Sequence, residues 1–154
     1  MMKPFSVGII HAFFICVHGF GRKMRPLMEE HGLTGPQFGA LKILKNRGAM
    51  SPTELSNYLS VTPGNITGII DRLKKLKYVE RRRLSSDRRV LKLAITSEGE
   101  KKLSDLLPVW ETKIEEIFKE VPLERQEEFL RTLLEIQERL HLNPGSHFEK
   151  EAEK

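Results

Sequence analysis

The residues best suited to bind another molecule are five arginines grouped around a short polar turn. Residues 81–83 are consecutive arginines, and Arg88 and Arg89 follow the segment Leu-Ser-Ser-Asp at residues 84–87. Arginines at this density repel one another unless a polyanion lies beside them, where each guanidinium can donate several hydrogen bonds to phosphate oxygens. The spacing therefore predicts a nucleic-acid contact.

The charge of the chain is divided among three segments. Residues 34–96 carry 13 Lys and Arg against 4 Asp and Glu, a net charge of +9, whereas residues 97–154 carry 9 against 15, a net of −6. Residues 1–33 carry 4 against 2, a net of +2. A chain of 154 residues with 39% hydrophobic and 31% charged residues is typical of a soluble globular protein. We therefore expect the basic middle to meet the polyanion and the flanks to serve another purpose.

Three helix starts and a hairpin are predicted within the basic segment. Residues 34–37 and 51–54 are both capping boxes, and Thr62-Pro63 begins a third helix that runs to about Leu76. Its apolar residues recur at helical spacing, at Ile66, Ile69, Ile70, Leu73 and Leu76. Two strand-like segments follow, at residues 78–84 and 89–95. Two short helices with a tight turn and then a basic hairpin predict a winged helix-turn-helix, in which the third helix enters a DNA groove.

The flanking segments are predicted to be helices with apolar faces. The first helix spans about residues 6–30 and ends at Gly32, and two further helices follow at about residues 97–120 and 123–141. The apolar run at residues 5–20 is shorter than the roughly 20 residues of a membrane span, and no cleavage site of a signal peptide follows it. We therefore expect a buried interface helix, no membrane contact, and a frayed tail at residues 143–154.

The order of several motifs resembles the MarR family of transcriptional regulators. The residues that carry the resemblance are Leu33-Thr-Gly-Pro-Gln-Phe38, Leu55 to Leu59, Asn65-Ile-Thr-Gly68 through Leu73, Tyr78-Val79, Asp87-Arg-Arg89 and Thr96-Ser-Glu-Gly99. The resemblance implies an α+β, mostly helical, winged helix-turn-helix fold. It also implies a homodimer that binds a palindromic operator in double-stranded DNA, most often as a repressor. Residues 1–33 and 97–142 would then be dimerisation helices, and residues 34–96 the DNA-binding domain.

The resemblance also implies roles for single residues. Asn65 and Thr67 would face the major groove, Ser51 and Thr62 would bind phosphates, and Arg88 or Arg89 would enter the minor groove. Asp87 would brace the wing by pairing with a nearby arginine. The full set of predicted DNA-binding residues is Ser51, Thr62, Pro63, Gly64, Asn65, Thr67, Gly68, Arg72, Arg83, Ser86, Asp87, Arg88 and Arg89. The chain departs from the family pattern at Gly68, where many relatives carry a base-reading arginine, and at Lys77, where glycine is common.

The first helix also contains polar residues that need an explanation. His11 and His18 are seven residues apart, so they share a helix face, where they can supply polarity to an interface or a pocket. The resemblance implies a crevice for a small aromatic or anionic ligand between the dimer helices and the winged domain, and Phe14, His11 and His18 would line it. No further ligands complete a metal site around the histidines, and no cofactor is expected. Cys16 lies among apolar neighbours, which favours a buried, unreactive thiol over a redox sensor.

Other classes of function fit the sequence less well. The chain has no glycine-rich phosphate loop, nucleophile elbow or His-Glu-x-x-His motif, so we do not expect an enzyme. A single cysteine excludes an internal disulfide and favours the cytoplasm. Two alternatives stay open, namely a winged-helix module that binds an acidic protein and an architectural protein that binds DNA without sequence preference.

Overall fold

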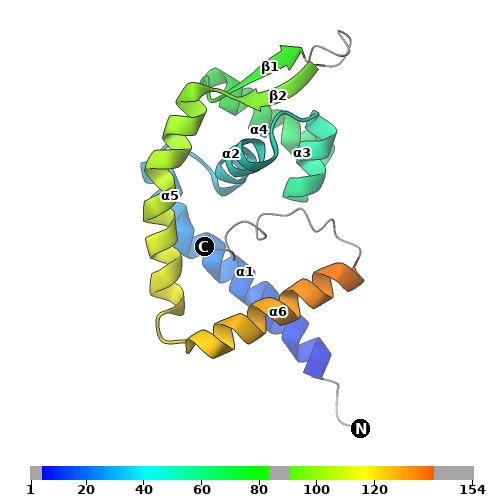
Figure 1. The fold of residues 1–154 in the computed structure, drawn as a ribbon, viewed down its shortest axis with the longest axis vertical. Coiled ribbons are helices and arrows are strands. Elements are labelled where there is room, and N and C mark those ends of the chain that lie inside the picture. Colours follow the sequence, from blue (N-terminus) through cyan, green and yellow to red (C-terminus); the bar gives the residue numbers. More distant parts are fainter. Residues whose placement is uncertain (1–4, 84–90, 141–154) are drawn as a thin grey trace.

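The computed structural model describes residues 5–83 and 91–140, which form six helices and a two-stranded sheet (Figure 1). The elements in chain order are α1 (Phe5–Glu30), α2 (Gly35–Arg47), α3 (Pro52–Leu59), α4 (Pro63–Lys75), β1 (Val79–Arg83), β2 (Leu91–Ile95), α5 (Ser97–Phe118) and α6 (Leu123–Arg139). The predicted helices and the hairpin are therefore confirmed, and their ends differ from the predicted ends by only a few residues. The α+β, mostly helical winged helix-turn-helix fold is confirmed as well.

Local capping chemistry explains where the helices of the winged domain begin. The Thr34 hydroxyl accepts a hydrogen bond from the Gln37 amide at 3.4 Å, and the Thr34 amide donates to the Gln37 side chain at 2.9 Å. The same reciprocal pair joins Ser51 and Glu54 at the start of α3. Each capping box provides acceptors for two backbone amides that would otherwise stay unpaired at the start of a helix.

The core lies where α2, α3 and α4 pack against the sheet and against the first half of α5. Its largest fully buried side chains are all leucines, at Leu41, Leu44, Leu55, Leu73, Leu93 and Leu106. The strands pair antiparallel with Val79 opposite Ile95 and Arg83 opposite Leu91. Met50, which precedes α3, forms an additional bridge to Leu93, with N–O distances of 3.0 and 2.7 Å. The hairpin is therefore attached to the helix-turn-helix by backbone hydrogen bonds as well as by packing.

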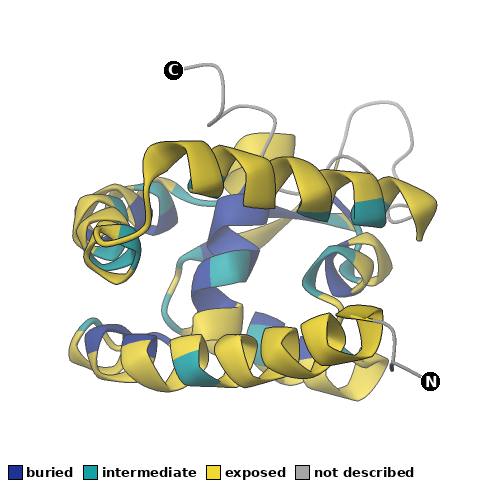
Figure 2. Ribbon diagram, turned by 90° about the horizontal axis from the view of Figure 1, so that it is seen from below, coloured by how far each residue is buried: buried dark blue, intermediate teal, exposed yellow. Residues whose placement is uncertain are grey.

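The flanking helices leave most of their apolar surface uncovered. Helix α5 leads away from the winged domain, and α1 and α6 lie on opposite sides of the molecule (Figures 1 and 2). No residue of α6 is buried, and α1 buries only Met24, Leu27 and Met28. The chain itself therefore leaves residues 5–20 uncovered, and the interface helix stays a prediction that a single protomer does not test.

The sequence also predicted that the apolar run at residues 5–20 is too short to span a membrane. The helix that contains this run is longer, so that prediction is wrong. Helix α1 has 26 residues and contains an 18-residue window with a mean hydropathy of 1.4, so by length and composition it could cross a bilayer. An uncovered helix of this kind needs a partner of some sort.

Candidate nucleic-acid interface

The turn between α3 and α4 sets the angle at which α4 leaves the domain. Ser60 adopts a left-handed conformation with φ 52° and ψ 40°, and its amide donates to the Asn57 carbonyl at 3.2 Å. The next amide, that of Val61, donates to the Ser56 carbonyl at 3.1 Å. These two bonds close α3 and turn the chain at once into the cap of α4.

The beginning of α4 presents a small, polar surface to solvent. The Thr62 hydroxyl caps the helix by accepting from the Asn65 amide at 3.4 Å. The predicted contact residues on this element are all exposed, namely Thr62, Pro63, Gly64, Asn65, Thr67, Gly68 and Arg72. The structure therefore brings these residues together on one accessible face, with the positive end of the helix dipole at its tip.

The predicted DNA-binding hydroxyls on α4 and at the start of α3 differ in what they can still donate. Thr67 donates its proton to the Pro63 carbonyl at 3.2 Å, so its oxygen is left mainly as an acceptor. The Ser51 hydroxyl accepts from the Glu54 amide at 3.2 Å and keeps its own proton for another acceptor, such as a phosphate. Because the Ser51 amide donates to the Glu54 carboxylate, the pKa of Glu54 is lowered from its ordinary value.

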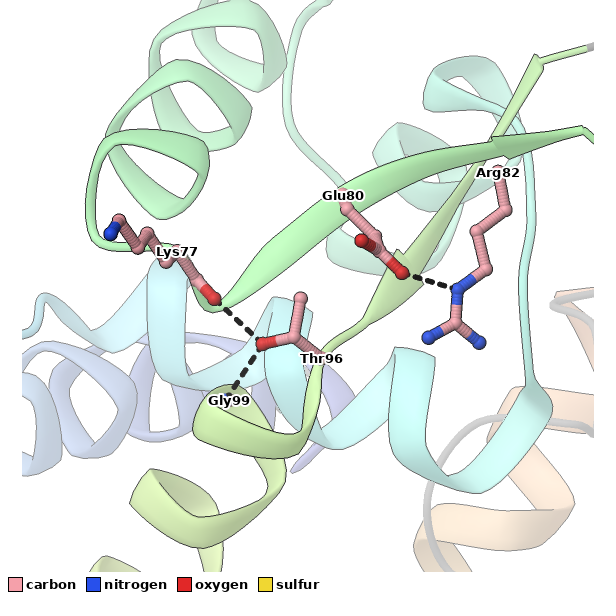
Figure 3. A network of polar contacts seen from close by, with 5 residues as sticks. All are labelled: Lys77, Glu80, Arg82, Thr96 and Gly99. Atoms are coloured by element: carbon pink, nitrogen blue, oxygen red, sulfur yellow. Dashed lines mark hydrogen bonds and ion pairs between the residues drawn. The ribbon is translucent and has the colours of Figure 1, made fainter.

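The described part of the wing carries exposed arginines and one carboxylate that sequence reasoning missed. Residues 81–83 are exposed on β1, and the Arg82 Nε donates to the Glu80 carboxylate (Figure 3). Glu80 therefore holds one wing arginine in place within the hairpin. The predicted brace Asp87 and the predicted contacts Ser86, Arg88 and Arg89 lie outside the described residues.

The base of the wing is held by a second set of contacts that the sequence did not reveal. Lys77 closes α4 with φ 60°, and the Thr96 hydroxyl donates to the Lys77 carbonyl at 2.6 Å (Figure 3). The same hydroxyl oxygen accepts from the Gly99 amide at 3.1 Å in the first turn of α5. Thr96 thus joins the end of α4, the hairpin and α5.

An open groove lies between α1, α2 and α5, at the junction of the winged domain and the flanking helices. His11, Phe14 and His18 of α1 line this groove together with Lys42 of α2 and Trp110 of α5. The Lys42 ammonium lies 4.3 Å from the centre of the Trp110 ring, with 8% of Lys42 exposed. The volume of about 1460 Å³ exceeds the roughly 300–1,000 Å³ of a typical small-molecule site, because the groove opens toward the uncovered side of α1.

Two other predictions for α1 can be compared with the structure. Cys16 is exposed on the described chain, so its predicted burial is wrong for the single protomer; its apolar neighbours are as uncovered as it is. Among the described residues, no group of three or more His, Cys, Asp or Glu side chains is arranged to hold a metal ion.

Comparison with known proteins identifies the family to which this chain belongs. Residues 33–91 match the family model described as "MarR family". The HTH-type transcriptional repressor YetL of Bacillus subtilis is 31% identical over 133 residues, which cover 82% of this chain and 80% of that protein. The chain belongs to the MarR family. This MarR-family protein is a DNA-binding transcriptional regulator that acts as a dimer, and the family and its named relatives are regulators rather than enzymes.

Solved MarR-type structures share the fold over nearly the whole chain. The transcriptional regulator BldR from Sulfolobus solfataricus superposes with a TM-score of 0.80 at 26% identity, over 90% of this chain and 99% of that one. Apo MarR from E. coli superposes with a TM-score of 0.71 at 22% identity, over 88% of this chain and 98% of that one. The flanking helices α1, α5 and α6 are therefore part of the shared architecture.

Proposed function

We propose that this MarR-family protein represses transcription by binding a palindromic operator with two winged domains. Helix α4 lies in the major groove of each half-site, and the arginine hairpin lies in the adjacent minor groove. The observation that supports this most directly is the exposed polar face of α4, which is followed within the same basic segment by the arginines of β1.

The basic charge of this surface suits a polyanion, and its exposed carboxamide favours a sequence-specific duplex complex over a nonspecific one. Residues 60–83 contain seven Lys and Arg and only two carboxylates, Asp71 and Glu80, of which Glu80 is paired with Arg82. Basic side chains supply affinity for any DNA. Among the described residues the Asn65 side chain has no hydrogen-bond partner, and a carboxamide in a major groove can read an adenine edge. The basic side chains and the Asn65 carboxamide together fit a protein that binds DNA sequence-specifically.

The uncovered helices supply the dimer contact in this proposal. Large apolar side chains are exposed along the outer half of α1 and along α6, among them Ile9, Phe13, Phe129 and Leu134. A second copy that covers both helices buries these side chains and sets two α4 helices about one turn of DNA apart, roughly 34 Å. A bilayer would cover α1 but not α6, so a protein partner accounts for more of the exposed surface.

The groove is the proposed site of release by a small aromatic or anionic ligand. Phe14, His11 and His18 offer an aromatic and polar wall, and the Lys42 ammonium supplies a positive charge beside the Trp110 ring. Trp110 is the single tryptophan of the chain, so its fluorescence reports directly on the groove. Aromatic carboxylates such as benzoate are expected to quench it in a saturable way and to weaken DNA binding. No quenching by any member of a panel of such acids would remove this part of the proposal.

The wing contact is tested by removing the two arginines beyond the turn. We expect the double variant Arg88→Ala, Arg89→Ala to bind duplex at least about tenfold more weakly in a mobility-shift titration, since wing contacts are to phosphate and the minor groove. The control is Arg125→Ala with Arg131→Ala, which removes the same charge from exposed positions on α6. Because α6 also belongs to the proposed dimer contact, sedimentation equilibrium must show that both variants remain dimeric. Equal binding by the wing variant and the wild type would exclude the wing from the interface.

A further inference from the structure

We propose that Thr96 is the positioning residue of the wing, and that its hydroxyl sets the direction in which the arginine hairpin points relative to α4 and α5. The inference rests on the proposed contact between the wing and DNA, and it adds the residue that orients this contact.

The end of α4 fixes the direction in which the chain enters the hairpin. The Lys77 amide donates to the Lys74 carbonyl and the Tyr78 amide donates to the Leu73 carbonyl, both at 2.9 Å, which is the Schellman arrangement. Lys77 completes it in the left-handed region, with φ 60°. The chain therefore leaves α4 in a single, well-defined direction, with the Lys77 carbonyl shortly before β1.

Thr96 makes three hydrogen bonds where the hairpin meets the end of α4 and the start of α5. Its hydroxyl donates to the Lys77 carbonyl at 2.6 Å, and its amide donates to the Tyr78 carbonyl at 3.0 Å. Its hydroxyl oxygen also accepts from the Gly99 amide at 3.1 Å (Figure 3). Because Lys77 precedes β1 and Thr96 follows β2, these bonds join the two legs of the hairpin at the base and tie both to the first turn of α5.

Gly99 shows how closely α5 is pressed against this joint. A Cβ added to Gly99 would lie 2.2 Å from the Tyr78 carbonyl oxygen and 2.8 Å from a side-chain carbon of Ile95. The close approach leaves the hairpin base little room to tilt toward α5. The Thr96 hydroxyl opposes a tilt away from α5, alongside the backbone bonds of Thr96 to Tyr78 and of Met50 to Leu93. A small tilt at the base moves Arg83, at the end of β1, by a larger distance.

The test compares Thr96→Val, which keeps the shape and removes the hydroxyl, with Thr96→Ser, which keeps the hydroxyl. The probe is a duplex selected by the wild-type protein from a random-sequence pool. We expect Thr96→Val to bind about tenfold more weakly, with a slope of log K against log salt that falls by about 2 per dimer. Its hydroxyl-radical protection at the wing's minor-groove positions is lost, while the methylation protection under α4 stays. Thr96→Ser restores affinity, slope and footprint.

Thr96 also caps α5, so a control must separate wing position from general stability. Thr34→Val removes an equivalent cap at the start of α2, where the threonine hydroxyl accepts from the Gln37 amide. We expect this variant to unfold more easily but to keep the wild-type salt slope and wing footprint. An equal loss of slope in Thr34→Val, or a Thr96→Ser variant as weak as Thr96→Val, would overturn the inference.

The same set of measurements distinguishes this inference from the proposed function. If the Arg88→Ala, Arg89→Ala variant binds like the wild type, the wing does not contact DNA and the proposed function fails. If that variant is weak while Thr96→Val keeps the wild-type slope and footprint, the wing contact stands and only the role of Thr96 is wrong.

Discussion

Replacing Ile9 and Phe13 by aspartate places charge on the uncovered half of α1. The two positions are one helical turn apart and share a face, and 57% of Ile9 and 41% of Phe13 are exposed on the single chain. In the proposed dimer a second copy covers them. The double variant should therefore break the dimer without touching the leucine core of the winged domain.

The loss of dimer stability can be worked out from the surface of Ile9 and Phe13 that the second copy would bury. Full burial of such a side chain contributes about 1.5–3 kcal/mol, of which roughly half is still available here. An aspartate in the same place adds a desolvation cost of about 1–3 kcal/mol. We take about 2 kcal/mol per site, and two-fold symmetry repeats each of the two substitutions, so the dimer loses about 8 kcal/mol. That is more than about five orders of magnitude in the dimer Kd.

Sedimentation equilibrium measures this loss directly. The control is Ile9→Leu with Phe13→Leu, which keeps the apolar surface and should stay dimeric. Circular dichroism must show the same helical content in both variants at the concentrations used. A dimer Kd within tenfold of the wild type for the aspartate variant would refute the interface assigned to α1.

Three further predictions follow from single contacts. Lys77→Gly should raise the free energy of unfolding by about 0.5 kcal/mol in urea titrations, because glycine adopts positive φ without strain, whereas Lys75→Gly inside α4 should lower it by about 1 kcal/mol. Glu80→Gln should strengthen binding to random-sequence duplex about threefold at low salt, because it releases Arg82 and removes a negative charge; unchanged or weaker binding would contradict this. The folded-state pKa of Glu54 lies below its ordinary value of 4.5, so the stabilisation by its carboxylate is complete above that pH and is lost as the pH falls through the folded pKa. The difference in unfolding free energy between the wild type and Glu54→Gln should therefore shrink in that acidic range and stay constant near neutrality.

Much of the fold could be predicted because its boundaries depend on neighbours in sequence. The caps at Thr34 and Ser51 act over three residues, and the apolar spacing of α4 repeats within two turns. The first helix was expected at about residues 6–30 and is found at Phe5–Glu30. The exposed residues of α4 followed in the same way, since they are the face opposite the buried isoleucines.

The contacts that organise the site could not be predicted, because they join residues far apart in the chain. Thr96 and Lys77 are 19 positions apart, and nothing in the local pattern pairs a threonine after one strand with a carbonyl before the other. The Met50–Leu93 bridge and the Lys42–Trp110 contact have the same character. The sequence of a hairpin indicates how its two strands pair, but not which distant residues contact its base.

The exposure of Cys16 in the single protomer was mispredicted for a different physical reason. Apolar neighbours around Cys16 correctly indicate a surface that avoids water, but they do not indicate which chain covers it. In the single protomer Cys16 and the side chains around it are exposed. The apolar composition therefore indicates a surface that a partner covers, and the interface on α1 stays a prediction.

A chemical footprint of the protein on a duplex that it selects from a random-sequence pool tests the central claim most directly. The account predicts two equivalent sets of protections, each with a major-groove site under α4 and a flanking minor-groove site under the hairpin, with centres about one helical turn apart and two-fold symmetry. A single unrepeated site, or uniform protection without groove pattern on every duplex, would contradict it.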